Sequence, residues 1–169
     1  LKSRQACYWK VRVWTDDNTP SPWSEPGTWT MGLLSAEDWQ GDWIGADWMK
    51  NNEGPLPWLR KTFPLEKVPA RATAYVCALG YYELYVNGEK VGDNVLAPAV
   101  TNYAKRGLYL THDIASYLKE GENCVALWLG RGWSLFMLEA ASQTGPLVRA
   151  QFEMEGVTDA PLIVATDAT

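Results

Sequence analysis

Few side chains in this sequence have the type and spacing that catalysis requires. Two pairs of neighbouring carboxylates, Asp16-Asp17 and Glu37-Asp38, lie in turn-like segments, whereas inverting hydrolysis of a glycosidic bond needs two carboxyl groups held about 6.5–9.5 Å apart across a sugar. The single histidine, His112, precedes Asp113, but no Gly-x-Ser-x-Gly motif supplies a nucleophile. We therefore predict solvated turns and caps for the carboxylate pairs, a structural His112 beside a helical turn, and no catalytic residue.

The composition is rich in aromatic residues. The 169 residues include ten Trp and eight Tyr and carry a formal net charge of −5. Aromatic rings stack on the apolar faces of sugars, which favours a carbohydrate partner. The alternative is that the Trp residues fill a sandwich core or a domain interface, where each ring buries a large apolar area. The acidic balance argues against nucleic acid, and no apolar run of about 18 residues suggests a membrane span.

Three cysteines, Cys7, Cys77 and Cys124, each lie in an apolar, strand-like run. An odd number without Cys-x-x-Cys spacing indicates neither a disulfide framework nor a metal site. We expect buried thiols that pack as small hydrophobic groups.

Short strands separated by Gly and Pro turns dominate the pattern. The most distinctive is Gly80–Asp93, in which Asn87-Gly88 separates two alternating runs, because Asn-Gly favours a type I′ hairpin turn. Helical signal is confined to 35–39, with Ser35 as cap, and to 113–118, with Asp113 as cap. This pattern predicts an all-β, antiparallel, jelly-roll-like β-sandwich. The strands are expected at Trp58–Pro64, Arg71–Leu79, Tyr82–Val86, Glu89–Gly92, Gly107–Thr111, Asn123–Leu129, Leu147–Glu155 and Leu162–Ala165.

The first residues read as a separate hairpin. Residues 7–14 alternate, with Trp9, Val11 and Val13 on one face, which predicts a half-buried strand. A polar turn and Trp23-Ser24-Glu25-Pro26 lead to a second strand near 28–31. This arrangement resembles the last two strands of a fibronectin type III-like domain. We expect the domains to be 1–33 (this hairpin), 34–46 (linker) and 47–169 (the sandwich, truncated at its C-terminal end).

Three segments, in order, carry a family resemblance: Arg60-Lys61-Thr62-Phe63, the Gly80–Asp93 hairpin and Gly121–Trp133. Together they resemble the N-terminal β-sandwich domain of bacterial α-L-rhamnosidases, glycoside hydrolase family 78. The resemblance implies an inverting hydrolase of terminal α-L-rhamnose whose two catalytic acids lie on an (α/α)6 barrel outside these residues. It therefore implies that this chain alone is inactive and acts as a scaffold for the catalytic domain of the same polypeptide.

An alternative implied by the resemblance is a calcium-dependent L-rhamnose-binding module. In some family members an Asp-Asn pair contributes to the metal site, and Asp93-Asn94 follows the hairpin here. Two side chains supply only part of the six to eight oxygens that calcium takes, and the competing interpretation is an ordinary turn. For stacking on the sugar we predict Trp133, because Gly130 and Gly132 leave space beside it. The scaffold interpretation requires no cofactor, and neither interpretation decides between the bacterial cytoplasm and a periplasmic or secreted location.

Overall fold

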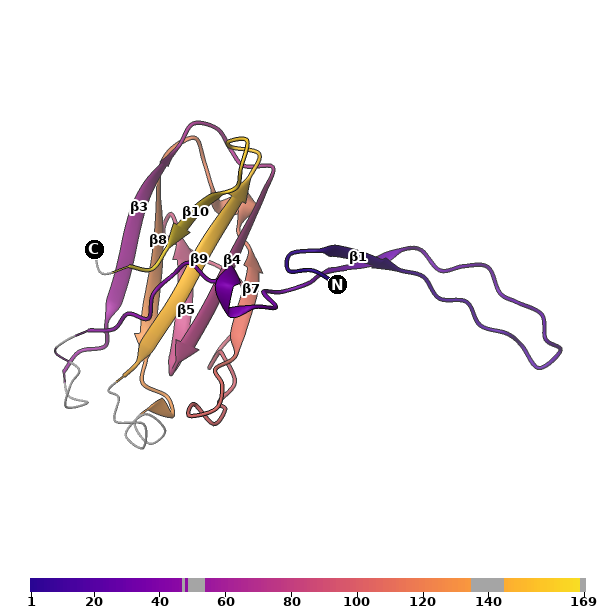
Figure 1. Cartoon of the computed structure of the whole chain (residues 1–169), viewed down its shortest axis with the longest axis horizontal. Coiled ribbons are helices and arrows are strands. Elements are labelled where there is room, and N and C mark those ends of the chain that lie inside the picture. Colours follow the sequence, from indigo (N-terminus) through magenta and orange to yellow (C-terminus); the bar gives the residue numbers. More distant parts are fainter. Residues whose placement is uncertain (47, 49–53, 135–144, 168–169) are drawn as a thin grey trace. The chain divides into compact units, whose positions relative to one another are not determined.

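Two compact units follow one another along the chain, Leu1–Trp39 and Gln40–Thr169. The computed structural model describes residues 1–46, 48, 54–134 and 145–167 (Figure 1). Each unit is described by itself below. The domain boundaries drawn from the sequence remain predictions.

The first unit is a hairpin. Its strands β1 (Ala6–Trp9) and β2 (Gly27–Thr30) pair antiparallel, with Ala6 opposite Thr30. The 3-10 turn η1 (Ala36–Asp38) follows, and its N-cap is Ser35, as the sequence predicted. The Asp38 carboxylate accepts hydrogen bonds from Ser3 Oγ and from the Ser35 amide, and it pairs with Arg4. These contacts, the Ser3 bond first, hold the pKa of Asp38 below its ordinary value.

Beyond β1 the hairpin is held by two serines rather than by a regular ladder. Ser21 and Ser24 donate their amide protons to the carbonyl oxygens of Val13 and Val11, at 2.9 and 2.8 Å. Their hydroxyl oxygens accept the amide protons of the same two valines, at 3.1 and 3.0 Å. Each serine thus makes both bonds of a strand pair, in a stretch where the neighbouring prolines have no N–H to contribute.

The expectation of a half-buried strand over 7–14 was wrong in two respects. The ladder ends at Trp9, and the side chains of Trp9, Val11 and Val13 are exposed. Within the described residues of this unit, β1 and β2 form a two-stranded sheet, and such a hairpin by itself buries neither of its sides.

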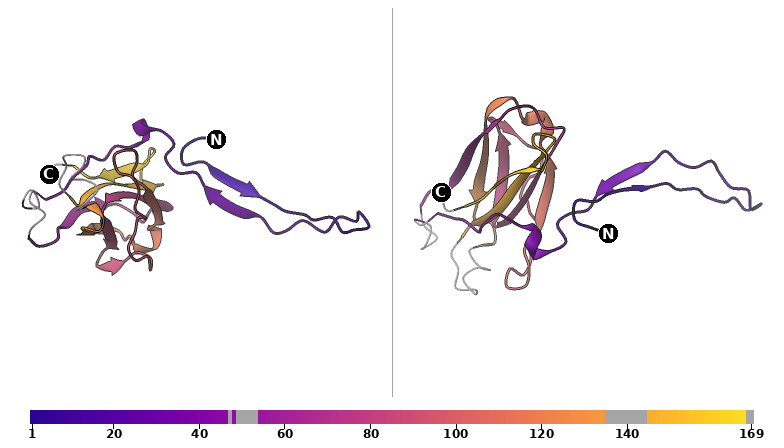
Figure 2. Two further views of the ribbon diagram at one scale, coloured as in Figure 1. Left: turned by 90° about the horizontal axis from the view of Figure 1, so that it is seen from below. Right: turned by 45° about the horizontal axis from the view of Figure 1, so that its top comes forward.

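The second unit is a sandwich of two four-stranded antiparallel sheets, visible as two layers in Figure 2. One sheet has the order β10-β9-β4-β7 and the other β3-β8-β5-β6. A short turn, η3 (Ala115–Tyr117), follows β7. The strands are β3 (Trp58–Leu65), β4 (Arg71–Leu79), β5 (Tyr81–Val86), β6 (Glu89–Lys90), β7 (Tyr109–Asp113), β8 (Gly121–Gly130), β9 (Leu147–Glu155) and β10 (Leu162–Ala165).

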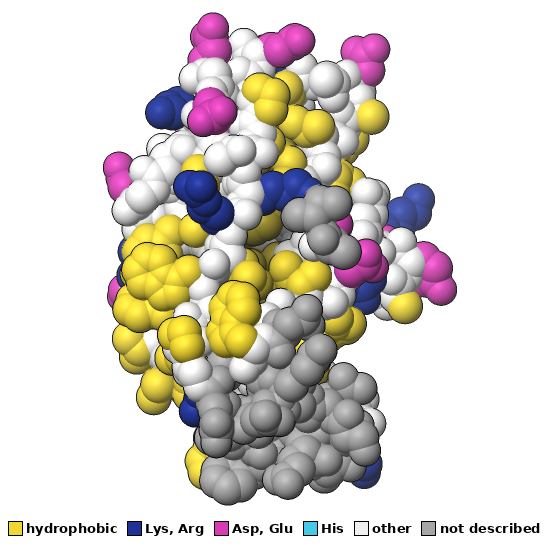
Figure 3. Space-filling model, turned by 90° about the vertical axis from the view of Figure 1, so that its left-hand side faces the viewer, with side chains coloured by type: hydrophobic (Ala, Val, Ile, Leu, Met, Phe, Trp, Pro, Cys, Tyr) yellow, Lys and Arg dark blue, Asp and Glu magenta, His cyan; other side chains and the backbone are white. Residues whose placement is uncertain are grey.

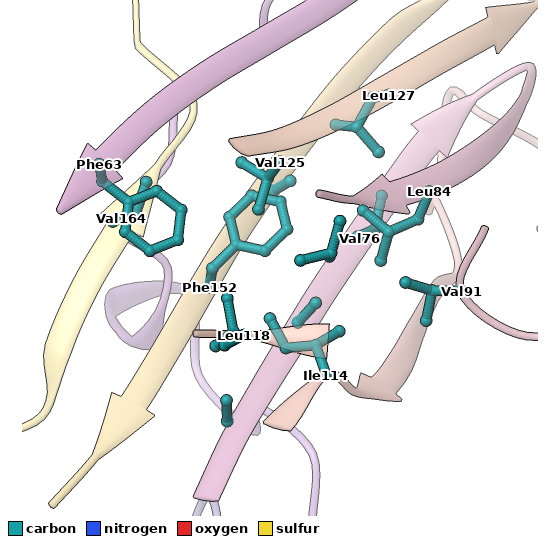
Figure 4. Close-up of a cluster of buried hydrophobic side chains, with 14 of the residues drawn as sticks. Phe63, Val76, Leu84, Val91, Ile114, Leu118, Val125, Leu127, Phe152 and Val164 are labelled. Carbon is teal, nitrogen blue, oxygen red and sulfur yellow. The ribbon is translucent and has the colours of Figure 1, made fainter. Parts of the chain in front are cut away.

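The core lies between the two sheets. Every second residue of each central strand points inward, as the pleat requires, so Val76 and Phe152 from one sheet meet Leu84 and Val125 from the other (Figure 4). Ile114 from the β7–η3 junction is also completely buried there. The predicted all-β sandwich is confirmed.

Three of the eight expected strands, β4, β9 and β10, match to the residue, and the other five differ by one or two residues at one end or both. Expected strand 107–111 begins two residues later, β6 ends at Lys90, and the helical segment 113–118 is a 3-10 turn whose N-cap is Ile114 rather than Asp113. Asp113 nonetheless caps the turn locally, since its carboxylate accepts the Ala115 amide proton at 3.0 Å.

Asn87-Gly88 forms the expected tight turn, with φ of 52° and 87°. Gly88 is exposed, but Asn87 is half-buried and its amide nitrogen donates to Tyr117 O and Asn123 Oδ1. Leu84 is buried and Tyr85 is half-buried. The turn therefore also joins the end of β5 to η3, through Tyr117, and to β8, through Asn123.

Candidate functional site

The three residues predicted to bind sugar occupy exposed positions. Asp93 and Asn94 follow β6 in the segment 92–100, and Trp133 follows β8 with 49% of its surface exposed. Asn94 borders a small hollow with Glu83 and Lys90. Their assignment as a sugar site stays a prediction.

The open space that Gly130 and Gly132 were expected to leave beside Trp133 is not present. A Cβ on Gly132, whose φ is +47°, would come within 2.8 Å of the Tyr81 ring. The backbone does approach closely at this glycine, but the space is filled by Tyr81 rather than left open beside Trp133.

The surroundings of Asp93 supply only part of a calcium shell. No group of three or more His, Cys, Asp or Glu side chains gathers at a potential metal site within the described residues. The pKa of Lys90 is raised, chiefly by its hydrogen bond to Glu83 and to a smaller extent by the negative charge of Asp93. The Lys90 ammonium group pairs with the Glu83 carboxylate.

His112 is buried in β7 and is bound to a tyrosine of the facing sheet. Its Nε2 lies 2.7 Å from the Tyr82 hydroxyl, and the two rings meet edge-on. Burial lowers the pKa of His112 and raises that of Tyr82. Burial likewise raises the pKa of the Cys77 thiol to about 11. These shifts favour neutral, unreactive groups, so the cluster stabilises the fold rather than forming a nucleophile.

The three cysteines are free thiols. Cys7 and Cys77 are buried as expected, whereas Cys124 is half-buried because it lies on the outer side of β8. Across the described residues no helix is long and apolar enough to cross a membrane.

The outer side of the β3–β8–β5 sheet carries an exposed aromatic surface. We call it the aromatic face and define it by Trp58, Tyr85, Ala126 and Trp128. Trp58 and Trp128 are direct partners in the β3–β8 register, with ring centroids 4.7 Å apart and planes inclined at 47°. They are 72% and 40% exposed. Hydrophobic side chains gather on the side of the molecule where β3 lies (Figure 3).

Two hollows lie on this face, on either side of Trp128. The first has a volume of about 340 Å³. The second has a volume of about 230 Å³ and includes the carboxylate of Glu83. The first is lined by Trp58, Tyr85, Gly88, Cys124, Ala126, Leu127 and Trp128, and the second by Leu56, Tyr81, Tyr82, Glu83, Leu96, Trp128, Leu129 and Gly130.

None of the ten tryptophans is part of the core. Nine are exposed and Trp39 is half-buried. The core part of that alternative was therefore wrong, because in the central strands Val, Leu, Ala and Phe occupy the inward positions. The other part, that the Trp residues lie at a domain interface, stays a prediction. The pairing of Trp58 with Trp128 was not predicted from the sequence. Alternation places each on an outward position, but only the strand register brings them together.

Comparison with known proteins places both units. The model of the "Alpha-L-rhamnosidase N-terminal domain" matches residues 67–169. The chain belongs to this family. A second model, "Rha78A-like, N-terminal immunoglobulin domain", matches residues 1–35. That description names an immunoglobulin domain where the sequence suggested a fibronectin type III-like one, and both are β-sandwiches.

Similar proteins are much longer than this chain. An α-L-rhamnosidase of Formosa agariphila is 38% identical over 154 residues, which cover 79% of this chain and 16% of that protein. The solved structure of an α-L-rhamnosidase from Dictyoglumus thermophilum matches with a TM-score of 0.85 and 31% identity, over 99% of this chain and 20% of that one. The Aspergillus terreus enzyme matches with a TM-score of 0.80 and 25% identity, over 99% and 21%.

Proposed function

We propose that this chain is a non-catalytic accessory part of an α-L-rhamnosidase, a larger polypeptide that hydrolyses terminal α-L-rhamnose from glycans or glycosides. The sandwich acts in that polypeptide as a scaffold for the catalytic domain. The observation that carries this proposal is the family match to the N-terminal domain, combined with the 16% of the Formosa agariphila relative that the chain spans.

The roles of the described carboxylates support the same conclusion. Asp38 accepts the Ser35 amide proton in the capping box of η1, Asp113 accepts the Ala115 amide proton at the start of η3, and Glu83 accepts hydrogen bonds from Lys90 and Tyr85. Glu153, buried in β9, accepts a hydrogen bond from Gln151 at 2.6 Å. Each of these groups already stabilises a turn, a strand or a surface pair, which is the role expected in a structural domain.

An activity assay tests the proposal. The purified 169-residue chain and the natural polypeptide that contains it are incubated with p-nitrophenyl α-L-rhamnoside. We expect release of nitrophenol by the longer protein and a blank-level signal from this chain. Turnover by the short chain that scales with its concentration and is lost on Glu83→Gln or Asp113→Asn would show that it has an active site of its own.

The scaffold role has a separate test in the longer protein. Phe152→Ala in the sandwich core should lower the temperature at which rhamnosidase activity is lost, while kcat at 25 °C stays unchanged. If inactivation temperature is insensitive to this substitution, the sandwich does not support the catalytic domain.

A further inference from the structure

The aromatic face is not needed to complete the sandwich. The inward residues of β3, β5 and β8 already fill the core, and the outward Trp58 and Trp128 keep 72% and 40% of their surface in water. Exposed apolar patches on folded proteins mark places where something binds. We therefore expect a molecule to bind to the aromatic face.

The first hollow of the aromatic face is lined by very small and very large side chains. In the first hollow Gly88, Cys124 and Ala126 contribute little bulk, while Trp58 and Trp128 stand beside them. Large rings next to very small side chains create a recess, and its volume of about 340 Å³ falls within the range of small-molecule sites.

We propose that the aromatic face binds a saccharide, with one sugar ring in the first hollow against Trp58 and Trp128 and the next ring on the far side of Trp128. The apolar C–H face of a pyranose packs on an indole ring, and such rings are rigid, so little conformational entropy is lost on binding. This site does not depend on the rhamnosidase assignment and is separate from Asp93, Asn94 and Trp133.

Polar groups beside the rings suit the hydroxyls of a sugar. Glu83, which lines the second hollow, accepts hydrogen bonds from Lys90 Nζ and from the Tyr85 hydroxyl, the latter at 2.7 Å. These bonds, that from Lys90 first, lower the pKa of Glu83 and keep it an ionised acceptor. Glu83 is the one charged side chain that lines the two hollows among the residues that the structure describes, and because Lys90 balances it, we assign a neutral rather than an anionic saccharide.

Affinity electrophoresis tests the site with the 169-residue chain as it exists. Native gels contain one of three soluble neutral polysaccharides: an L-rhamnan, a mixed-linkage β-glucan or a xylan. We expect at least one to retard the chain, and retardation to persist with a chelator present. Trp58→Ala and Trp128→Ala should each weaken binding about tenfold, while Trp128→Phe, which keeps a ring, should weaken it less.

Two further variants separate the recess from general aromatic surface. Ala126→Phe leaves both tryptophans in place but fills the first hollow, so binding should be lost. Trp43→Ala is the matched control, because Trp43 is 43% exposed in the same unit and lies outside both hollows, so binding should be unchanged.

Several results would overturn the proposal. The first is that none of the three polysaccharides retards the chain. The second is that the Trp58→Ala and Trp128→Ala variants are retarded as strongly as the unsubstituted chain. The third is that retardation is lost when the chelator is added. Sedimentation velocity gives another: a dimer that Trp128→Ala dissociates would mean that the face binds a second copy of the chain.

Discussion

On the outer side of β4 and β9, Tyr75, Gln151 and Glu153 are buried, whereas on the outer side of β3 and β8, Trp58 and Trp128 face solvent. Both sets of residues occupy outward positions of strands with the same alternation, and of these strands only β3 lies at the edge of its sheet. The first side, which we call the covered face, has neighbours from the segment that precedes the sandwich: Gln40 donates its amide proton to Gln151 Oε1, and Arg149 donates to the carbonyl of Gly41.

The difference shows that burial on an outer face depends on what lies across it and not on the strand itself. Polar residues on the covered face satisfy one another, as in the bond from Gln151 to Glu153, because a buried group without a partner is costly. Large apolar residues on the aromatic face remain in water. The following predictions test this contrast, beginning with the largest effect.

Removing one aromatic side chain from each face should have very different consequences. Tyr75 is 1% exposed and Trp128 is 40% exposed. We expect Tyr75→Ala to lower the free energy of unfolding by about 3 kcal/mol because it leaves a cavity, and Trp128→Ala to lower it by about 0.5 kcal/mol. Urea denaturation measures both. Equal losses would mean that Trp128 is as much part of the fold as Tyr75.

A polar pair on the covered face gives the next effect. Gln151→Ala removes the acceptor of the Gln40 amide, in a part-buried hydrogen bond, and the donor to Glu153, in a buried one. We expect a loss of about 2 kcal/mol. Arg60→Ala, at an exposed outward position of β3, is the control and should cost about 0.5 kcal/mol or less. If Gln151→Ala lowered the free energy of unfolding no more than Arg60→Ala, the polar residues of the covered face would contribute no more to stability than exposed ones.

Lowering the pH should reduce the free energy of unfolding through His112, which is buried between the two sheets. Its pKa in the folded state lies below the ordinary value of 6.5 because the ring is buried, so the unfolded chain binds its proton more readily. The stabilising contribution is complete above pH 6.5 and is lost as the pH falls through the folded-state pKa, at about 1.4 kcal/mol for each unit of depression. Unfolding midpoints at several pH values measure this slope, and His112→Gln should remove it. A slope that survives in the variant must come from other groups.

The smallest expected effect is that of calcium. Asp93 and Asn94 supply few oxygens and lie near Lys90, so we expect calorimetry with L-rhamnose to give the same result with calcium and with a chelator. Heat that requires calcium and disappears in Asp93→Ala would instead establish the metal-dependent module that the family resemblance suggested, and would place a second sugar site at this turn.

Local pattern was sufficient for much of the fold. Arg71–Leu79, Leu147–Glu155 and Leu162–Ala165 were predicted to the residue, and Asn87-Gly88 forms its turn, because alternation and turn chemistry are properties of neighbouring residues. Contacts between distant segments were not predictable in this way. The bond between His112 and Tyr82 joins residues 30 positions apart in facing sheets.

The candidate site was harder to predict for the same reason. Trp58 and Trp128 are 70 positions apart, and only the β3–β8 register makes them neighbours. Trp133 was favoured because two glycines precede it, but sequence gave no sign that Tyr81 packs against Gly132. Alternation separates inward from outward side chains. It does not show which outward side chains meet, or which of them another segment covers.

The serine-held part of the hairpin has a consequence for solubility. A strand that exposes Trp and Val side chains together with free N–H groups invites pairing with strands of other molecules, which is how aggregation begins. Here Pro20, Pro22 and Pro26 carry no N–H, and the amide protons of Ser21 and Ser24 are already bound to Val13 and Val11. A second molecule therefore finds few donors along the edge formed by residues 20–26, which disfavours the addition of a further strand on that side of the hairpin.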